Sequence, residues 1–251
     1  MTARRRLVLI THGPALVDND SRALAAVKGL ERALPGLRLT WRVTEERQLA
    51  SVPQRDEWLV EATKDGDFPF LCNGDKSYPV TISGQQTPAG TNPGRQPLLN
   101  VHAELPMDGA GLAAATDVLE AVAEGACSYW GHTSPDDYGS EVSQQMRHSA
   151  HGPERSPRGL PMLNLPWHIR SPAIPQYLGW LNYWSAASAQ AIGFPDPARD
   201  ADLLTRARRT AVGGWVVRLT DTPLDYDDPT HLDALKRAYE RFPEIGGRST
   251  P

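Results

Sequence analysis

The amino-acid sequence predicts an α+β fold, in which a mixed β-sheet packs against helices in a single layered domain spanning residues 1–251. Segments with strand-like alternation interleave with segments of helical period. Two neighbouring strand-like segments, 78–85 and 97–105, are joined by the Gly- and Pro-rich stretch QTPAGTNPGRQ, which is typical of a hairpin. The chain has 251 residues, of which 40% are hydrophobic, so it is long enough for a sizeable core.

The first part of the chain supplies alternating strands and helices. LVLITH at 7–12 predicts a buried strand, and the alternating apolar residues of 37–45 predict a half-buried one. Between them, apolar residues at helical spacing from Leu24 to Leu34 predict a helix that Asp18 or Asp20 caps. A short amphipathic helix is expected over 53–64, where a proline stands at the start.

The second part of the chain is expected to be richer in helices. Its predicted elements are a helix over 109–129, a long polar loop over about 131–161, helices over 179–195 and 196–210, a strand within 210–221 and a helix from Pro229, capped by Asp228. Within the loop, EVSQQM is expected to form one or two helical turns.

The segment GWLNYWSAASAQAIGFP at 179–195 carries an unusual aromatic cluster. On a helix, Trp180, Tyr183 and Trp184 share one face with the alanines that follow them. An exposed stripe of this size invites aggregation unless a partner covers it, so we predict that these three residues, with Trp215, belong to the core.

Charge and cysteine content narrow the class of protein. A net charge of −4 disfavours a nucleic-acid binder, which usually carries a basic face. No apolar run approaches the ~18 residues of a membrane span, and LVLI is shorter than the ~7–15 residues of a signal-peptide core. Two cysteines without C-x-x-C spacing are typical of a reduced, cytoplasmic protein.

Motifs that carry catalysis or bind cofactors are absent from the sequence. It contains no phosphate-binding glycine loop, no G-x-S-x-G elbow and no helical H-E-x-x-H, so we expect no cofactor and no metal. His148 and His151, near Asp136 and Asp137, are expected to be solvated loop residues. DGDF at 65–68, with Asp75, is expected to form turns.

His12 stands at the end of the first predicted strand, a position where histidines act in some enzymes. It has no visible nucleophile or carboxylate partner in the sequence, so a buried, hydrogen-bonded histidine is expected. A hydrolase built around His12 stays open as an alternative.

The strongest acidic segment is DTPLDYDDP at 221–229. Two of its aspartates are expected to serve turns and the helix cap. The others, with Tyr226 among them, can present negative charge to a basic partner.

Several motifs, taken in order, resemble the immunity protein 52 family and an uncharacterised bacterial family related to it. They are GWLNYWS, GFPDPARDADLL, GGWVVRLTDTPLD and PTHLDALKRAYERFPEIGG in the last third, with CNGD-x-x-YPVTI and EGA-x-x-x-WG before them. The resemblance implies an immunity protein that binds and neutralises a secreted polymorphic toxin, a class that often has the nuclease fold of restriction endonucleases. It implies no catalytic residues, no membrane and no direct contact with nucleic acid.

The residues that we expect to contact the toxin lie in the 131–158 segment and in the acidic segment. They are Asp136, Asp137, Tyr138, Asp225, Tyr226, Asp227 and Asp228. A regulatory module with a different protein partner is the remaining alternative.

Overall fold

A computed structural model describes residues 5–44, 46–64, 66, 68–146, 156 and 158–248. Its strands form one sheet in the order β3-β2-β4-β5-β6-β1-β7-β8-β10-β9, and each strand pair in the described residues is antiparallel. The strands are β1 (Arg6–Pro14), β2 (Trp41–Val43), β3 (Leu49–Ser51), β4 (Phe68–Cys72), β5 (Thr81–Thr87), β6 (Leu98–Pro106), β7 (Trp130–Pro135), β8 (Leu181–Trp184), β9 (Ala207–Arg209) and β10 (Trp215–Arg218). The predicted α+β class is confirmed, as is the β5–β6 hairpin.

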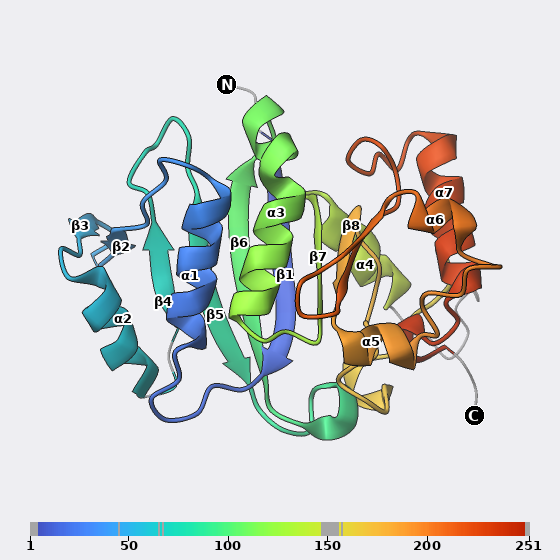
Figure 1. Ribbon diagram of the computed structural model, residues 1–251, viewed down its shortest axis with the longest axis horizontal. Helices are drawn as coiled ribbons and strands as arrows, with labels where there is room; N and C mark the ends of the chain where they lie inside the picture. Colours follow the sequence, from blue (N-terminus) through green and yellow to red (C-terminus); the bar gives the residue numbers. More distant parts are fainter. Residues whose placement is uncertain are drawn as a thin grey trace.

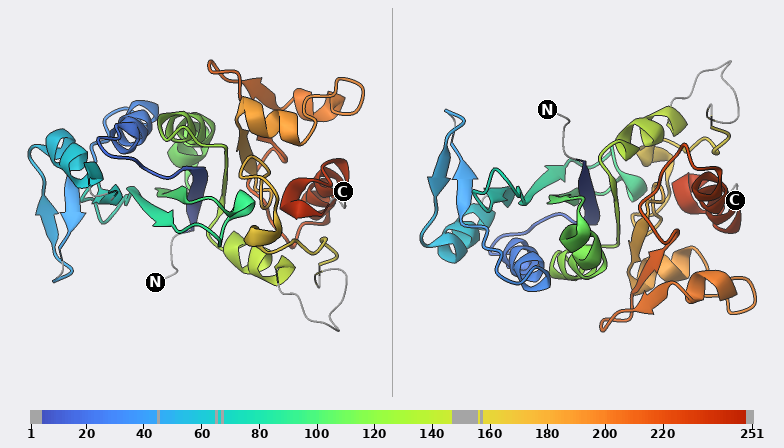
Figure 2. Two further views of the ribbon diagram at one scale, coloured as in Figure 1. Left: turned by 90° about the horizontal axis from the view of Figure 1, so that it is seen from below. Right: turned by 90° about the horizontal axis from the view of Figure 1, so that it is seen from above.

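Helices cover the two faces of this sheet unequally (Figure 1). Figure 2 shows α1 (Arg22–Ala33), α2 (Arg55–Lys64) and α3 (Gly109–Gly125) on one face. On the other face, α4 (Tyr138–Gln145) and α7 (Pro229–Arg241) lie towards the β7–β8–β10 end. The short helices α5 (Ala186–Ala191) and α6 (Ala201–Leu204) connect the last strands.

Close packing of α1 against α3 depends on two glycines. A Cβ at Gly29 would lie 2.6 Å from the carbonyl oxygen of Ala121, and one at Gly125 would lie 2.6 Å from the amide nitrogen of Ala26. The helix backbones therefore touch, which buries the apolar face of each helix against the sheet.

The central strands of the sheet have one apolar face, which the helices bury, and one more polar face. On β1, Leu7 and Leu9 are fully buried beneath the helices, whereas Val8 and Ile10 on the opposite face are half-buried. On that second face His12 pairs with Asn100, and Ile10 pairs with His102 on one side and His132 on the other. The polar face of β6, β1 and β7 therefore carries a row of histidines.

The segment 179–195 is not one helix. Tyr183 and Trp184 lie in strand β8, Trp180 comes directly before it, and only Ala186–Ala191 is helical. Trp180, Tyr183 and Trp184 are each at most 4% exposed, and Trp215 is half-buried against the core. Side chains of a strand alternate between faces, so Trp184 packs on Phe194 and Phe242 while its neighbour Tyr183 faces the other side of the sheet.

The predicted loop over 131–161 is also wrong for its first half. Residues 131–135 continue strand β7, and α4 covers the expected EVSQQM turns. The sequence hid this strand because its polar side chains are buried: Thr133 and Ser134 are fully covered and His132 is 2% exposed. The second half of the predicted loop lies largely outside the described residues.

Other boundaries differ in smaller ways. The expected helix over 196–210 is reduced to α6, followed by strand β9, because Asp196 accepts the amide of Ala198 in a turn. The first helix begins after Ser21 rather than after Asp20. Asp228 caps α7 as predicted, since its carboxylate accepts the amide of Thr230 at 2.8 Å. No helix within the described part of the chain is long and apolar enough to cross a membrane.

Candidate functional site

Two acidic segments far apart in the sequence meet on the face of the sheet that carries α4 and α7. Asp136 and Asp137 lie between β7 and α4, and the residues before α7 lie beside them, because the rings of Tyr138 and Tyr226 stack with centroids 6.0 Å apart. The resulting acidic patch consists of Asp136, Asp137, Asp225, Asp227 and Asp228.

Arg158 ties the two halves of the acidic patch together. Its guanidinium donates to the carbonyl oxygen of Tyr226 at 2.6 Å and to Asp227 at 3.0 Å. It also lies 3.4 Å from Glu141 of α4 and over the ring of Tyr226. Asp227 stays 86% exposed, so the carboxylate remains available to a partner.

Only part of the charge of the acidic patch is neutralised. Asp137 pairs with Arg5 at 3.1 Å and Asp227 with Arg158. Asp136 has no ion pair among the described residues and is exposed. The five aspartates therefore outnumber the two arginines, and the patch presents negative charge to solvent.

Tyr138 does not lie on the surface as a toxin contact would. It is 3% exposed, and burial raises the pKa of its phenol well above the ordinary value. Tyr226 is half-buried, and burial raises its pKa as well, with Tyr239 and Glu141 adding to the effect. Both phenols stay neutral, so these two tyrosines hold the acidic patch in place and leave surface contact to the aspartates.

A cavity of about 430 Å³ opens beside the acidic patch, between α4 and the polar face of β1 and β7. We call it the His132 cavity. Its apolar walls include Val8, Ile10, Val142 and Met146. Its polar lining includes His102, His132, Asp136, Tyr138 and Tyr177. Asp136 belongs to both the acidic patch and the cavity.

His132 lies between Tyr177 and Tyr138, with ring centroids 5.0 and 5.4 Å away. Neither of its ring nitrogens has a hydrogen-bond partner in the part of the chain that the structure describes. Burial, and then repulsion from His12 and His102, lower the pKa of His132 to about 3. The imidazole is therefore neutral at physiological pH.

His12 lies beside an amide and an indole ring. Its Nδ1 lies 2.7 Å from Oδ1 of Asn100, and its ring stacks on Trp130 at 4.0 Å. Burial lowers its pKa to about 4, although the hydrogen bond with Asn100 opposes the change. The expected buried, hydrogen-bonded histidine is confirmed. Its hydrogen-bond partner is the amide side chain of Asn100.

The remaining candidates are described only in part. His148 and His151 lie outside the described residues, as do Asp65 and Asp67. Asp75 accepts the amide of Ser77 at 2.7 Å, next to Gly74 with a positive φ of 74°, so the expected turn is confirmed there. Within the described ranges no cluster of three or more His, Cys, Asp and Glu side chains is placed to hold a metal ion.

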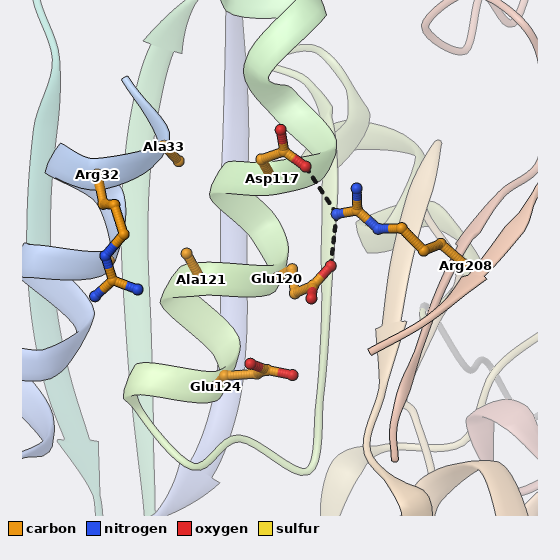
Figure 3. Close-up of a pocket in the computed structure, with 8 residues that line it drawn as sticks. Arg32, Ala33, Asp117, Glu120, Ala121, Glu124 and Arg208 are labelled. Carbon is orange, nitrogen blue, oxygen red and sulfur yellow. Dashed lines mark hydrogen bonds and ion pairs between the residues drawn. The ribbon is translucent and has the colours of Figure 1, made fainter. Parts of the chain in front are cut away.

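A second hollow lies on the helical face, between α1, α3 and β9 (Figure 3). It follows from the close α1–α3 packing. Asp117 and Glu120 of α3 both accept from Arg208 of β9, at 2.8 and 2.5 Å, so Arg208 offsets one of their two negative charges. Its charges serve to fasten β9 to α3, and the hollow is a weaker candidate than the His132 cavity.

Comparison with known proteins places the chain in a family. A family model described as a domain of unknown function, DUF5953, matches residues 18–250. The chain belongs to the DUF5953 family. No curated protein matches it.

Among solved structures, this DUF5953 chain is similar to Pseudomonas aeruginosa T6SS protein PA0821. The likeness has a TM-score of 0.52 at 16% sequence identity, and it covers 95% of this chain and 73% of that one. At 16% sequence identity, this likeness shows a shared fold alone. Membership in an uncharacterised family agrees with one part of the resemblance noted in the sequence.

Proposed function

We propose that this chain is an immunity protein that binds a cognate secreted toxin through the acidic patch and neutralises it by covering the toxin, without catalysis. The observation that carries the proposal is the meeting of two acidic segments in one patch, held by Arg158 and the Tyr138–Tyr226 stack.

The electrostatics of the patch favour a basic partner. A toxin that cleaves nucleic acid carries a positive surface where it grips phosphates. A surface with excess negative charge accelerates the encounter with such a toxin and repels acidic proteins. The toxin class is therefore a nuclease, as the resemblance to the immunity protein 52 family implies.

Two comparisons support this proposal from outside the geometry. The chain belongs to a family of unknown function, and its sequence motifs resemble those of the immunity protein 52 family. It also shares its fold with a protein described as a type VI secretion protein.

Co-expression tests the proposal. Toxin genes adjacent to the gene for this chain are expressed with the wild type, with Asp136→Lys/Asp227→Lys, or with Asp18→Lys/Glu57→Lys as a control. The control reverses two exposed charges away from the patch. The wild type and the control are expected to restore growth, and the patch variant is expected to lose protection while keeping its thermal melting temperature.

Two results would contradict the proposal. If the wild type protects against none of the adjacent toxins, the immunity function is wrong, and a regulatory module with another partner becomes the better account. If the patch variant protects as well as the wild type, the chain is an immunity protein but docks through another surface.

A further inference from the structure

The His132 cavity is lined by the chemistry of a ligand site. Its volume of about 430 Å³ lies within the range of small-molecule pockets, ~300–1,000 Å³. Val8, Ile10 and Val142 form apolar walls, and the rings of Tyr138 and Tyr177 face His132 from two sides. Such a lining accepts an aliphatic or flat group with few polar atoms.

His132 and the hydroxyl of Tyr138 are buried polar groups of the cavity lining without a hydrogen-bond partner among the described residues. His132 is 2% exposed, and in the described part of the chain both ring nitrogens are without a hydrogen-bond partner. Burying an unpaired polar group costs about 1–3 kcal/mol, so a ligand that supplies the missing bond recovers that free energy. A Cβ at Gly179 would lie 2.9 Å from Nδ1, so Nδ1 faces the chain, and we assign to the ligand the other buried nitrogen, Nε2.

The charge of the lining selects the sign of the ligand. Of the described residues that line the cavity, none is lysine or arginine, and Asp136 is the one formal charge. The neutral imidazole offers a lone pair, and the tyrosine faces attract cations. An anion would meet no positive group there.

We propose that the His132 cavity receives an arginine side chain of the basic partner. The guanidinium donates to Asp136 and to Nε2 of His132, and the aliphatic stem lies along Val8 and Val142. A guanidinium fits better than an ammonium because it is flat, less hydrated and able to stack on tyrosine. That the arginine belongs to a toxin rests on the proposed function, whereas the preference for an alkylguanidinium follows from the cavity alone.

Direct titration of the full chain with butylguanidinium tests the cavity independently of any toxin. Butylurea, which has the same shape and no charge, is the matched neutral probe. Binding of butylguanidinium is expected to shift the NMR signals of the His132 ring and to be about tenfold tighter than binding of butylurea, the size of one charge-assisted hydrogen bond. Equal binding of the two probes, or no binding of either, would overturn the proposal.

Variants locate the binding. Asp136→Asn and His132→Phe are each expected to weaken butylguanidinium binding about tenfold. Asp18→Asn removes the same charge beyond the opposite end of β1 and is expected to leave binding unchanged. Since Asp136 and Asp18 are both exposed, these two substitutions leave folding intact. Loss of binding in the Asp18 variant, or retention in the Asp136 variant, would place the probe elsewhere.

Competition with the toxin separates this inference from the proposed function. Saturating butylguanidinium is expected to weaken toxin binding, and butylurea is expected not to. If butylguanidinium occupies the cavity and toxin affinity does not change, the assignment of the arginine to the toxin is wrong while the proposed function stands. If the wild type binds no toxin, the proposed function fails and the titration alone decides the cavity.

Discussion

At the scale of single residues, His132 and His12 are two buried histidines of one sheet that differ in their hydrogen bonding. His12 has a hydrogen bond to Asn100 and a stacked tryptophan, whereas His132 has tyrosine rings around it and no partner for its nitrogens in the described residues. The difference predicts opposite responses to the same substitution.

Replacing His132 by phenylalanine is expected to raise the free energy of unfolding by about 1–2 kcal/mol, because the change removes a buried polar group that lacks a partner. His12→Phe is the matched control. It leaves Oδ1 of Asn100 without its hydrogen bond and is expected to lower the free energy of unfolding. Urea denaturation measures both, and a loss of stability in His132→Phe as large as that in His12→Phe would show that His132 serves the fold.

The same two histidines predict a pH dependence. Their pKa values in the folded protein, about 4 for His12 and about 3 for His132, lie below the 6.5 of the unfolded chain. Unfolding therefore takes up protons below pH 6.5, and stability that is complete above pH 6.5 is lost as the pH falls. Each histidine contributes about 1.4 kcal/mol per pH unit.

Urea denaturation between pH 6.5 and 5 checks this dependence, because few carboxylates titrate in that window. His132→Phe is expected to reduce the slope by about 1.4 kcal/mol per pH unit. An unchanged slope would mean that His132 titrates with an ordinary pKa in the folded chain.

At the scale of elements, helices that bury one face were predicted correctly from the sequence. Strands β7 and β8, which are buried on both faces, were not. The helices α1, α3 and α7 each have a single apolar stripe, so their period is visible. In β8, four successive residues are buried because the sheet is covered on both faces there. A run that is buried at every position, here including Asn182, has no period, and the spacing of the aromatic residues fits a helix equally well.

The candidate site divides in the same way. The aspartates of the acidic patch are visible in the sequence because charge clusters are local. The His132 cavity is not, because His132 and Tyr177 meet only through the pairing of strands and the placement of α4. β7 itself was missed, since a strand with buried polar side chains lacks the pattern on which prediction depends.

A buried ion pair between Arg55 and Glu31 links α2 to α1. Arg55 donates twice to Glu31 of α1, each time at 3.1 Å, and Glu31 also accepts the amide of Leu39 at 2.8 Å. Glu31→Gln is expected to cost about 3 kcal/mol, because it removes the buried counter-charge of Arg55 and leaves the more exposed Asp56 as its remaining carboxylate partner among the described residues.

The matched control is Asp117→Asn, which weakens the exposed pair with Arg208 and is expected to cost at most about 1 kcal/mol. Thermal or urea unfolding compares the two variants. Equal losses would mean that the Glu31–Arg55 pair is hydrated in solution.

At the scale of the whole molecule, the sheet carries different surfaces on its two sides. Helices α1, α2 and α3 close one face, and the other face is left polar over β5, β6 and β1. The acidic patch and the His132 cavity lie next to this polar face, at the border of the region that α4 and α7 cover. A partner that docks there contacts charge and cavity together, and it leaves the hydrophobic core undisturbed.

Association kinetics with the purified toxin measure this docking directly, at low and at physiological salt. The wild type and the Asp18→Lys/Glu57→Lys control are expected to associate rapidly and to slow as salt rises. The Asp136→Lys/Asp227→Lys variant is expected to associate about tenfold more slowly, with a weaker dependence on salt. Equal rates for the patch variant and the wild type, or a wild-type rate that ignores salt, would contradict docking through the acidic patch.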